Sequence, residues 1–154
     1  MLPTRLEAEK QIREIKIDDI PSVLPLYITY YNENEDGCWT ETTAGKRIHQ
    51  VLSMEDSYGL VLEKDDQVIG FVMGFFKQYD DIVGYTLEEI VIAKDFQNQG
   101  LGSFLLNELE QRAKEKGASC VELQAVNDEM HEKYYGKAGY YTAANFVMKA
   151  KWFE

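Results

Sequence analysis

The spacing of hydrophobic positions changes along this chain from every second residue to every third or fourth, which predicts both strands and helices. Two β-rich runs, Tyr58–Glu63 and Gln67–Phe76, flank Lys64-Asp65-Asp66, an arrangement typical of a hairpin. Further strands are expected at Gln11–Ile17, Gly84–Ala93, Ser119–Val126 and the two ends of Tyr140–Trp152.

The clearest helix is Leu101–Lys116, whose apolar residues stand at 101, 104, 105, 109 and 113 and which Gly117 would end. An earlier helix is expected from about Ser22 to Tyr31, because Pro25 then falls in the first turn, where an N–H has no partner. The other helices are expected from Thr42 or Thr43 to Leu52 and over Asp128–Lys137. The resulting order, β-α-α-β-β-β-α-β-α-β-β, predicts an α+β fold in a single domain, residues 1–154.

Length, charge and residue spacing exclude several classes of partner. No apolar run approaches the roughly 20 residues that cross a bilayer, and Met1–Lys10 lacks the apolar core of a signal peptide, so a cytoplasmic protein without membrane contact is expected. The net charge of −11 speaks against nucleic acid as a partner and fits a cationic small molecule, although acidity also serves solubility. Neither the two cysteines nor the two histidines, Cys38, Cys120, His49 and His131, have metal-site spacing, so no metal is expected.

A glycine turn carries the strongest functional signal. Gln97-Asn-Gln-Gly100-Leu-Gly102-Ser103 joins an apolar strand to the amphipathic helix. Backbone N–H groups and the positive end of a helix dipole meet at such a junction and favour a phosphate group. Leu105 stands where a Rossmann fingerprint needs its third glycine, and the lysine of a Walker turn is missing. From the pattern alone, a plain strand-to-helix turn remains the alternative.

This segment resembles motif A of the GNAT superfamily of N-acetyltransferases, Gln/Arg-x-x-Gly-x-Gly/Ala. Ile90-Val-Ile92 is similar to the family's fourth strand, and Asn127 with Tyr134-Tyr135-Gly-Lys-Ala-Gly139-Tyr140 is similar to motif B. Val147-Met-Lys-Ala-Lys resembles the last strand. The resemblance implies a mixed, mostly antiparallel sheet flanked by helices, with the fourth and fifth strands splayed apart. A weaker likeness to the diamine acetyltransferases rests on Leu87-Glu-Glu-Ile-Val-Ile and Phe75-Phe76-x-x-Tyr79-Asp80.

The resemblance implies acetyl-CoA as cosubstrate. Its pyrophosphate would lie on the backbone N–H groups of the turn, and its pantetheine arm would pair with the exposed strand edge like an added strand. The residues expected to bind it are Ile90, Val91, Ile92, Gln97, Asn98, Gln99, Gly100, Leu101, Gly102, Ser103, Asn127 and Tyr134.

An alkyl amine is mostly protonated at neutral pH, because its pKa is about 10.4, so a base must free its lone pair. Strand periodicity places Glu88 on the same face as Ile92, and a glutamate at the matching position acts in several GNAT enzymes. Glu88 is therefore the candidate base, through a water molecule, and Glu89 is expected on the opposite face. A solvated strand residue, or one that only binds the substrate ammonium, is the alternative for Glu88.

The family uses a tyrosine of motif B to protonate the leaving thiolate. Counting back from Gly139 selects Tyr135, whereas counting forward from Asn127 selects Tyr134. Tyr135 is preferred because its spacing to Gly139 fixes the helix end nearby, and Tyr134 stays open. Either ring could instead pack in the core or against CoA.

The resemblance implies that the acceptor pocket is bordered by Tyr30, Tyr31 and Glu33. Aromatic rings together with carboxylates, Glu88 included, would suit an ammonium group. Core packing and a solvated loop are the alternative. The reaction expected is direct acetyl transfer to a primary amine, polyamine-like or otherwise cationic, in a ternary complex, since no cysteine is well placed as a nucleophile. A protein amine as acceptor and a non-catalytic acyl-CoA sensor are the alternatives, and a homodimer is left open.

Overall fold

The chain divides into two compact units, Met1–Gln124 and Ala125–Glu154. The computed structural model describes residues 10–154, so the absence of a signal peptide, predicted from Met1–Lys10, concerns residues that lie almost wholly outside the described part. That residues 1–154 form one domain stays a prediction.

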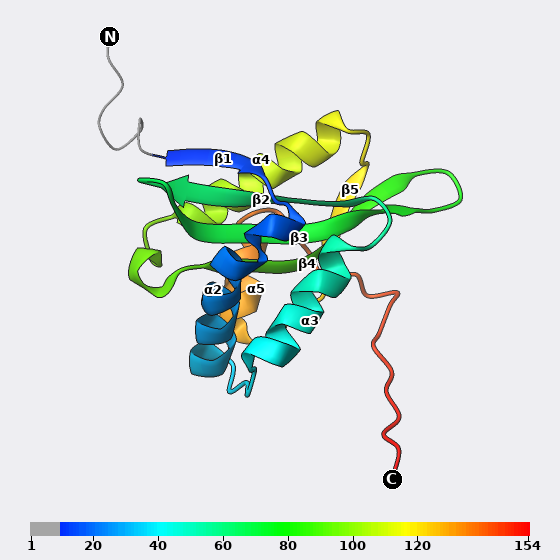
Figure 1. Ribbon diagram of the computed structural model, residues 1–154. Helices are drawn as coiled ribbons and strands as arrows, with labels where there is room; N and C mark the ends of the chain where they lie inside the picture. Colours follow the sequence, from blue (N-terminus) through cyan, green and yellow to red (C-terminus); the bar gives the residue numbers. More distant parts are fainter. Residues whose placement is uncertain (1–9) are drawn as a thin grey trace. The chain divides into compact units, whose positions relative to one another are not determined.

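The first unit contains a five-stranded sheet in the order β1-β2-β3-β4-β5 (Figure 1). The first four strands pair antiparallel, and β5 pairs parallel to β4. This confirms a mixed, mostly antiparallel sheet. The strands are β1 (Lys10–Glu14), β2 (Ser57–Lys64), β3 (Gln67–Gln78), β4 (Val83–Ile92) and β5 (Cys120–Leu123).

The predicted hairpin is confirmed, because β2 and β3 are joined by Asp65 and Asp66 alone. Both residues have positive φ, 52° and 61°, as in the tight two-residue turns that match the twist of antiparallel strands. Aspartate is one of the few residues besides glycine that tolerates this conformation. The turn therefore fixes the register of β2 on β3.

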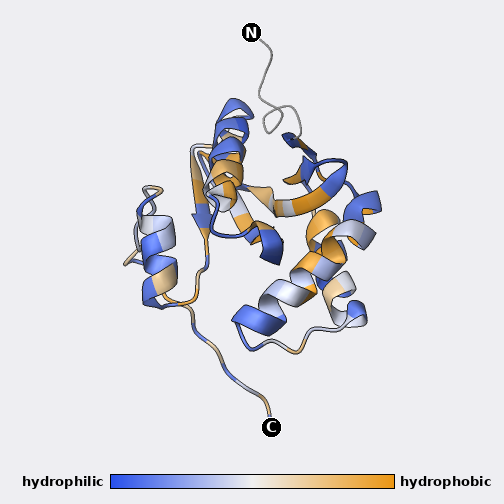
Figure 2. Cartoon of the chain, turned by 90° about the vertical axis from the view of Figure 1, so that its left-hand side faces the viewer, coloured by the Kyte–Doolittle hydropathy of each residue, from blue (hydrophilic) through white to orange (hydrophobic). Residues whose placement is uncertain are grey.

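Helices cover both faces of the sheet. Helix α4 (Leu101–Glu115) contacts β2 to β5 on one face, whereas α2 (Ile20–Asn34) and α3 (Glu41–Leu52) pack on the other (Figure 1). Figure 2 shows hydrophobic residues along the central strands and interspersed with hydrophilic ones along the helices. One core cluster joins α2 and α3 to the sheet and includes Val23, Tyr27, Ile48, Phe71 and Val91.

The two helices of this second layer begin earlier than predicted. Helix α2 starts at Ile20, directly after the short 3₁₀ helix η1 (Ile17–Asp19), so Pro25 lies inside the helix and not in its first turn. Pro21 occupies the first-turn position instead, where its missing N–H costs nothing. Helix α3 is capped by Thr40, whose hydroxyl accepts from the Thr43 N–H at 3.1 Å. Thr42 and Thr43, predicted as caps, lie within the helix.

The second unit contains one helix, α5 (Glu129–Gly136), whose first turn is capped by the Asp128 carboxylate. The strands predicted at the ends of Tyr140–Trp152 are wrong within the described residues, since that segment forms no strand. Its composition favours strands, but a strand also needs a ladder partner. Trp152, at the end of this segment, is 93% exposed.

Candidate active site

The glycine turn lies between η2 (Lys94–Phe96) and α4. Gly100 is the residue before the helix and has a φ of +79°, a left-handed conformation that favours glycine. A Cβ added to Gly100 would meet no atom within 4 Å, so the turn faces open space. Asn98, with a φ of +61°, belongs to the same exposed turn.

This turn has the properties of an anion site. The first N–H groups of any helix lack partners within the helix, and in α4 no side chain caps them. The side-chain amide of Gln97 donates to the Ile92 carbonyl oxygen at 2.9 Å and so ties the turn to the end of β4. A phosphate group would fit where the Gly100 Cβ is missing.

Strand β4 runs past its partner β5. The two strands pair only from Gly84 opposite Cys120 to Leu87 opposite Leu123, whereas β4 continues to Ile92. On the side of β4 where β5 ends, residues Glu88 to Ile92 therefore pair with no strand of the described sheet. This open edge leads directly to the glycine turn. Free N–H and C=O groups along such an edge can bind an extended amide-bearing ligand.

A β-bulge interrupts β4 at the start of this edge. Leu87 lies opposite Gly74 and Glu89 opposite Met73, so Glu88 has no direct partner on β3. A Cβ on Gly74 would lie 2.0 Å from the Thr86 carbonyl oxygen, so the close approach of the two backbones requires glycine. Because a bulge adds one residue, it changes which face later side chains occupy.

The prediction that Glu89 lies on the face opposite to Glu88 is wrong for this reason. Both carboxylates reach the same side chain of α3, Arg47. The Arg47 Nη2 donates to Glu88 Oε2 at 2.8 Å, and its Nε donates to Glu89 Oε1 at 3.2 Å. The periodicity of two on which the prediction depended does not hold across the bulge.

Glu89 is buried, with its side chain 9% exposed, and both of its oxygens are hydrogen-bonded. The Tyr27 hydroxyl donates to Oε1 at 3.3 Å, and the Tyr31 hydroxyl donates to Oε2 through a short contact. Burial raises the pKa of Glu89, although the Tyr31 and Arg47 contacts oppose this change. Burial next to the Glu89 charge likewise raises the pKa values of Tyr27 and Tyr31, so both phenols remain donors at neutral pH.

Glu88 differs from its neighbour. Its side chain is 27% exposed, and within residues 10–154 its only recorded hydrogen bond joins Oε2 to Arg47. Oε1 is thus available to a substrate or a water molecule, whereas both oxygens of Glu89 are occupied. The structure therefore brings Glu88, Tyr31 and the edge of β4 together around Arg47.

The other predicted acceptor residues lie at the end of α2. The Tyr30 ring packs edge-on against Tyr31, with ring centroids 5.0 Å apart. The Glu33 carboxylate is exposed and pairs with Lys94 of η2 at 3.0 Å, beside the glycine turn. Tyr31 donates to the Glu89 carboxylate of β4.

The motif B tyrosines belong to the second unit. The rings of Tyr134 and Tyr135 on α5 stand edge-on, 4.9 Å apart, and Tyr135 also contacts Tyr140 at 5.7 Å. Lys137 lies over the Tyr134 ring at 5.7 Å. Asn127 precedes the capping Asp128. These contacts do not choose between the two tyrosines as acid.

Two residues of this site were missed in the sequence. Arg47 gives no local signal, because its partners lie 41 and 42 positions away. Glu89 was assigned to the other face, yet Gly74 inside an apolar strand was a signal for a bulge.

A family model decides the relationship. Residues 20–140 match the model of the Acetyltransferase (GNAT) family, which is most of the chain. The chain belongs to this family. GNAT proteins are acyltransferases that use acetyl-CoA, and the match includes the glycine turn, the edge of β4 and α5.

Two curated relatives support this assignment. The uncharacterized protein YxbD of Bacillus subtilis is 29% identical over 93 residues, which are 60% of this chain and 54% of that protein. An uncharacterized N-acetyltransferase of Archaeoglobus fulgidus is 25% identical over 117 residues, which are 73% of this chain and 80% of that protein. The chain thus aligns with only about half of YxbD.

A solved structure confirms the GNAT fold. The crystal structure of a possible acetyltransferase from Clostridium difficile 630 superposes with a TM-score of 0.81 at 16% identity, and the match covers 95% of this chain and 99% of that one. At this identity the likeness concerns the fold alone.

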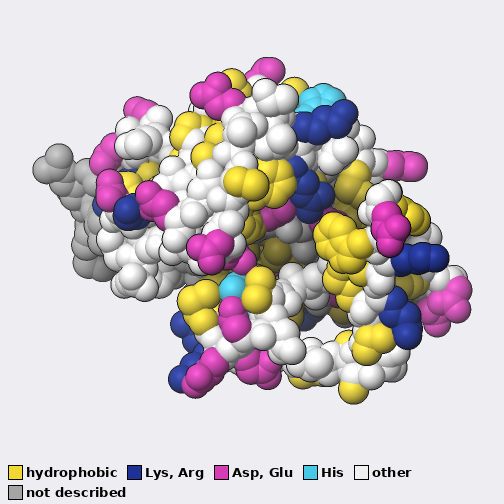
Figure 3. Space-filling view, turned by 90° about the horizontal axis from the view of Figure 1, so that it is seen from below, with side chains coloured by type: hydrophobic (Ala, Val, Ile, Leu, Met, Phe, Trp, Pro, Cys, Tyr) yellow, Lys and Arg dark blue, Asp and Glu magenta, His cyan; other side chains and the backbone are white. Residues whose placement is uncertain are grey.

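Surface properties add little to the GNAT assignment. Figure 3 shows acidic side chains spread over the face that it views, and not gathered in one patch. Within residues 10–154, no helix has both the length and the apolar character to span a membrane, and no three potential ligands gather as a metal site.

Proposed function

We propose that this chain is an acetyl-CoA-dependent N-acetyltransferase that transfers an acetyl group directly to a primary amine in a ternary complex. The observation that carries the proposal is the edge of β4, which runs five residues beyond its pairing with β5 and ends at the glycine turn. An extended pantetheine arm would pair along Glu88–Ile92, and the pyrophosphate would lie on residues Gln97–Ser103.

Glu88 is the base in this proposal. Its free oxygen and partial exposure allow it to take a proton from the acceptor ammonium, directly or through water. The amine lone pair then forms the new C–N bond while the C–S bond of the thioester breaks. The phenol of Tyr135, or of Tyr134, gives its proton to the departing thiolate. The second proton, which the nitrogen loses as it becomes an amide, restores that phenol through solvent.

A cationic amine is the acceptor class that the charges favour. Glu88, Glu89 and Arg47 together carry one net negative charge when all are ionised, and Tyr30 and Tyr31 supply aromatic faces nearby. A polyamine and a protein amine both satisfy this description. Localisation in the cytoplasm and a homodimer belong to the proposal as well.

The test is thiol release from acetyl-CoA by the purified chain, with spermidine, aminoglycosides, amino acids and peptides as acceptors. Turnover with one acceptor class supports the proposal and names the class. Tight CoA binding without turnover on any acceptor would instead identify an acyl-CoA sensor. An acetylated enzyme trapped during turnover would rule out direct transfer.

A further inference from the structure

Arg47 joins two carboxylates that are neighbours in the sequence but differ in burial and in the number of their hydrogen-bond donors. Glu89 is buried and holds three donors, whereas Glu88 is partly exposed and holds one. The guanidinium of Arg47 uses separate nitrogens for the two, and such a planar fork restrains both partners at once. The orientation of Glu88 thus depends on Arg47, and that of Arg47 on Glu89.

We propose that Arg47 and Glu89 are a positioning pair that orients the Glu88 carboxylate. The inference rests on the proposed function, in which Glu88 is the base. Neither residue of the pair needs to touch the substrate for this role.

The charges of the pair act on Glu88 in opposite directions. The Arg47 cation donates to Glu88 Oε2 at 2.8 Å and attracts the negative charge of that carboxylate. The negative charge of Glu89 offsets that cation, because the same guanidinium is shared. Burial tends to lower the pKa of Arg47, but its bonds to Glu88 and Glu89 outweigh this and raise it, so the cation persists throughout the working pH range.

Glu89 is itself anchored from a third element. The hydroxyls of Tyr27 and Tyr31 on α2 donate to its two oxygens, which leaves it no freedom to turn toward a substrate. The charged and titratable groups recorded around the cluster are Tyr27, Tyr31 and Glu35 of the α2 region, Arg47 of α3, and Tyr85, Glu88 and Glu89 of β4. Of the groups in residues 10–154, Arg47 is the one with a recorded hydrogen bond to Glu88.

The experiment measures the titration of the Glu88 carboxyl by ¹³C NMR and, in parallel, the acid limb of the kcat/KM profile. In Arg47→Gln, loss of the cation should move both to higher pH. In Glu89→Gln, the undivided attraction of Arg47 should move both to lower pH. Shifts in the same direction, or no shift in either variant, would overturn the inference.

Two further variants keep the test decisive. Arg47→Lys retains the charge but not the fork, so we expect a titration near that of the wild type and a kcat at least fivefold lower with little change in KM. This variant also decides the matter if Glu89→Gln fails to fold, because a kcat equal to wild type would refute positioning. Asp19→Asn, which removes a similarly buried carboxylate beside another arginine, should leave both profiles unchanged.

The NMR titration separates this inference from the proposed function. Opposite shifts without turnover on any acceptor would uphold the positioning pair and reject the enzyme. Turnover, together with titrations that neither substitution shifts, would uphold the enzyme and reject the positioning pair.

Discussion

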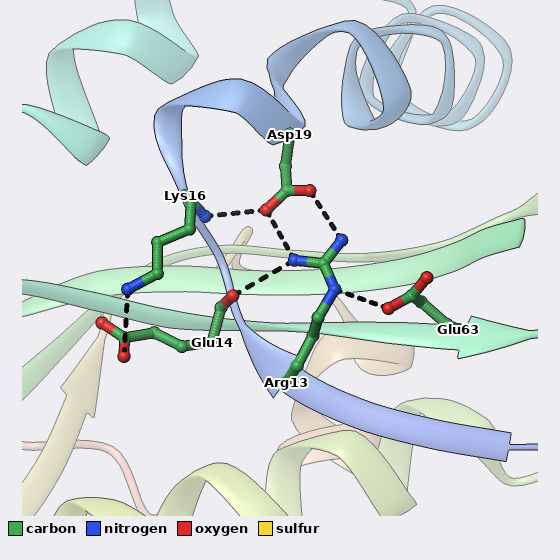
Figure 4. A network of polar contacts seen from close by, with 5 residues as sticks. All are labelled: Arg13, Glu14, Lys16, Asp19 and Glu63. Carbon is green, nitrogen blue, oxygen red and sulfur yellow. Dashed lines mark hydrogen bonds and ion pairs between the residues drawn. The ribbon is translucent and has the colours of Figure 1, made fainter. Parts of the chain in front are cut away.

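Two clusters in this molecule are built from the same parts, one arginine between two carboxylates, yet they serve different ends. In the first, Arg13 of β1 binds Asp19 of η1 at 2.7 and 2.9 Å and Glu63 of β2 at 2.5 Å (Figure 4). In the second, Arg47 of α3 holds Glu88 and Glu89 of β4.

The difference lies in how the inner carboxylate is satisfied. Asp19 receives two nitrogens of Arg13 and the Lys16 N–H, and the Arg13 hydrogen bond holds its pKa below the usual range. Glu89 receives one nitrogen and two phenols in a more buried place, and burial raises its pKa. Asp19 thus joins β1 to η1, whereas Glu89 is held by α2 and α3 and anchors the arginine that also contacts Glu88.

The largest expected effect on kcat concerns the outer carboxylates of the two clusters, Glu88 and Glu63. Glu88 and Glu63 are each the second partner of an arginine, with side chains 27% and 21% exposed. Glu88→Gln should lower kcat about 100-fold and shift its pH profile upward, because the amine loses its base. Glu63→Gln removes the same charge and should change kcat less than twofold. Equal losses of kcat in the two variants would contradict the view that the two clusters have different roles.

A smaller effect concerns the tyrosines of α5, in the second unit. In the proposed reaction the leaving thiolate needs a proton donor, so Tyr135→Phe should lower kcat about tenfold. Tyr134→Phe, one residue away on the same helix, should have the weaker effect. Steady-state thiol release measures both, and the reverse order would make Tyr134 the acid.

The smallest effect concerns stability. Asp19→Asn should lower the free energy of unfolding at pH 7 by about 1–2 kcal/mol, since an amide cannot replace a carboxylate between the Lys16 N–H and the Arg13 guanidinium. Because the pKa of Asp19 is lowered on folding, its contribution is fully present above the unfolded value of about 3.9. It is lost as the pH falls below that value and through the lower pKa of the folded state.

Urea unfolding of both proteins at pH 7 and pH 3 measures this contribution. The gap between wild type and variant should shrink at pH 3, and a gap that grows would assign Asp19 the opposite charge dependence. kcat should not change.

The elements with strong local periodicity could be predicted from the sequence. The stripe of α4 and the Asp65-Asp66 hairpin depend on neighbours a few residues apart, and both are confirmed. The face of Glu89 could not be predicted from periodicity, because the bulge opposite Gly74 changes it. The contacts of Arg47 could not be predicted from the sequence either, because they join α3 to β4 and form only in the folded chain.

The segment after α5 shows a different limit. Its residues favour strands by composition, but whether a strand forms depends on a partner that composition does not name. The contact of Arg13 with Asp19 spans only six residues, but it depends on the bend of the chain between β1 and η1, which periodicity does not describe.

The central claim is that the glycine turn at the start of α4 binds acetyl-CoA, and calorimetric titration of acetyl-CoA into matched glycine variants tests it most directly. Gly100 and Gly117 stand at the two ends of α4, both with positive φ, and a Cβ at either would meet no atom within 4 Å. Valine at either position carries a similar strain of about 1–2 kcal/mol. We predict that Gly100→Val weakens binding at least tenfold while Gly117→Val leaves it unchanged. Equal affinities in the two variants would contradict the account.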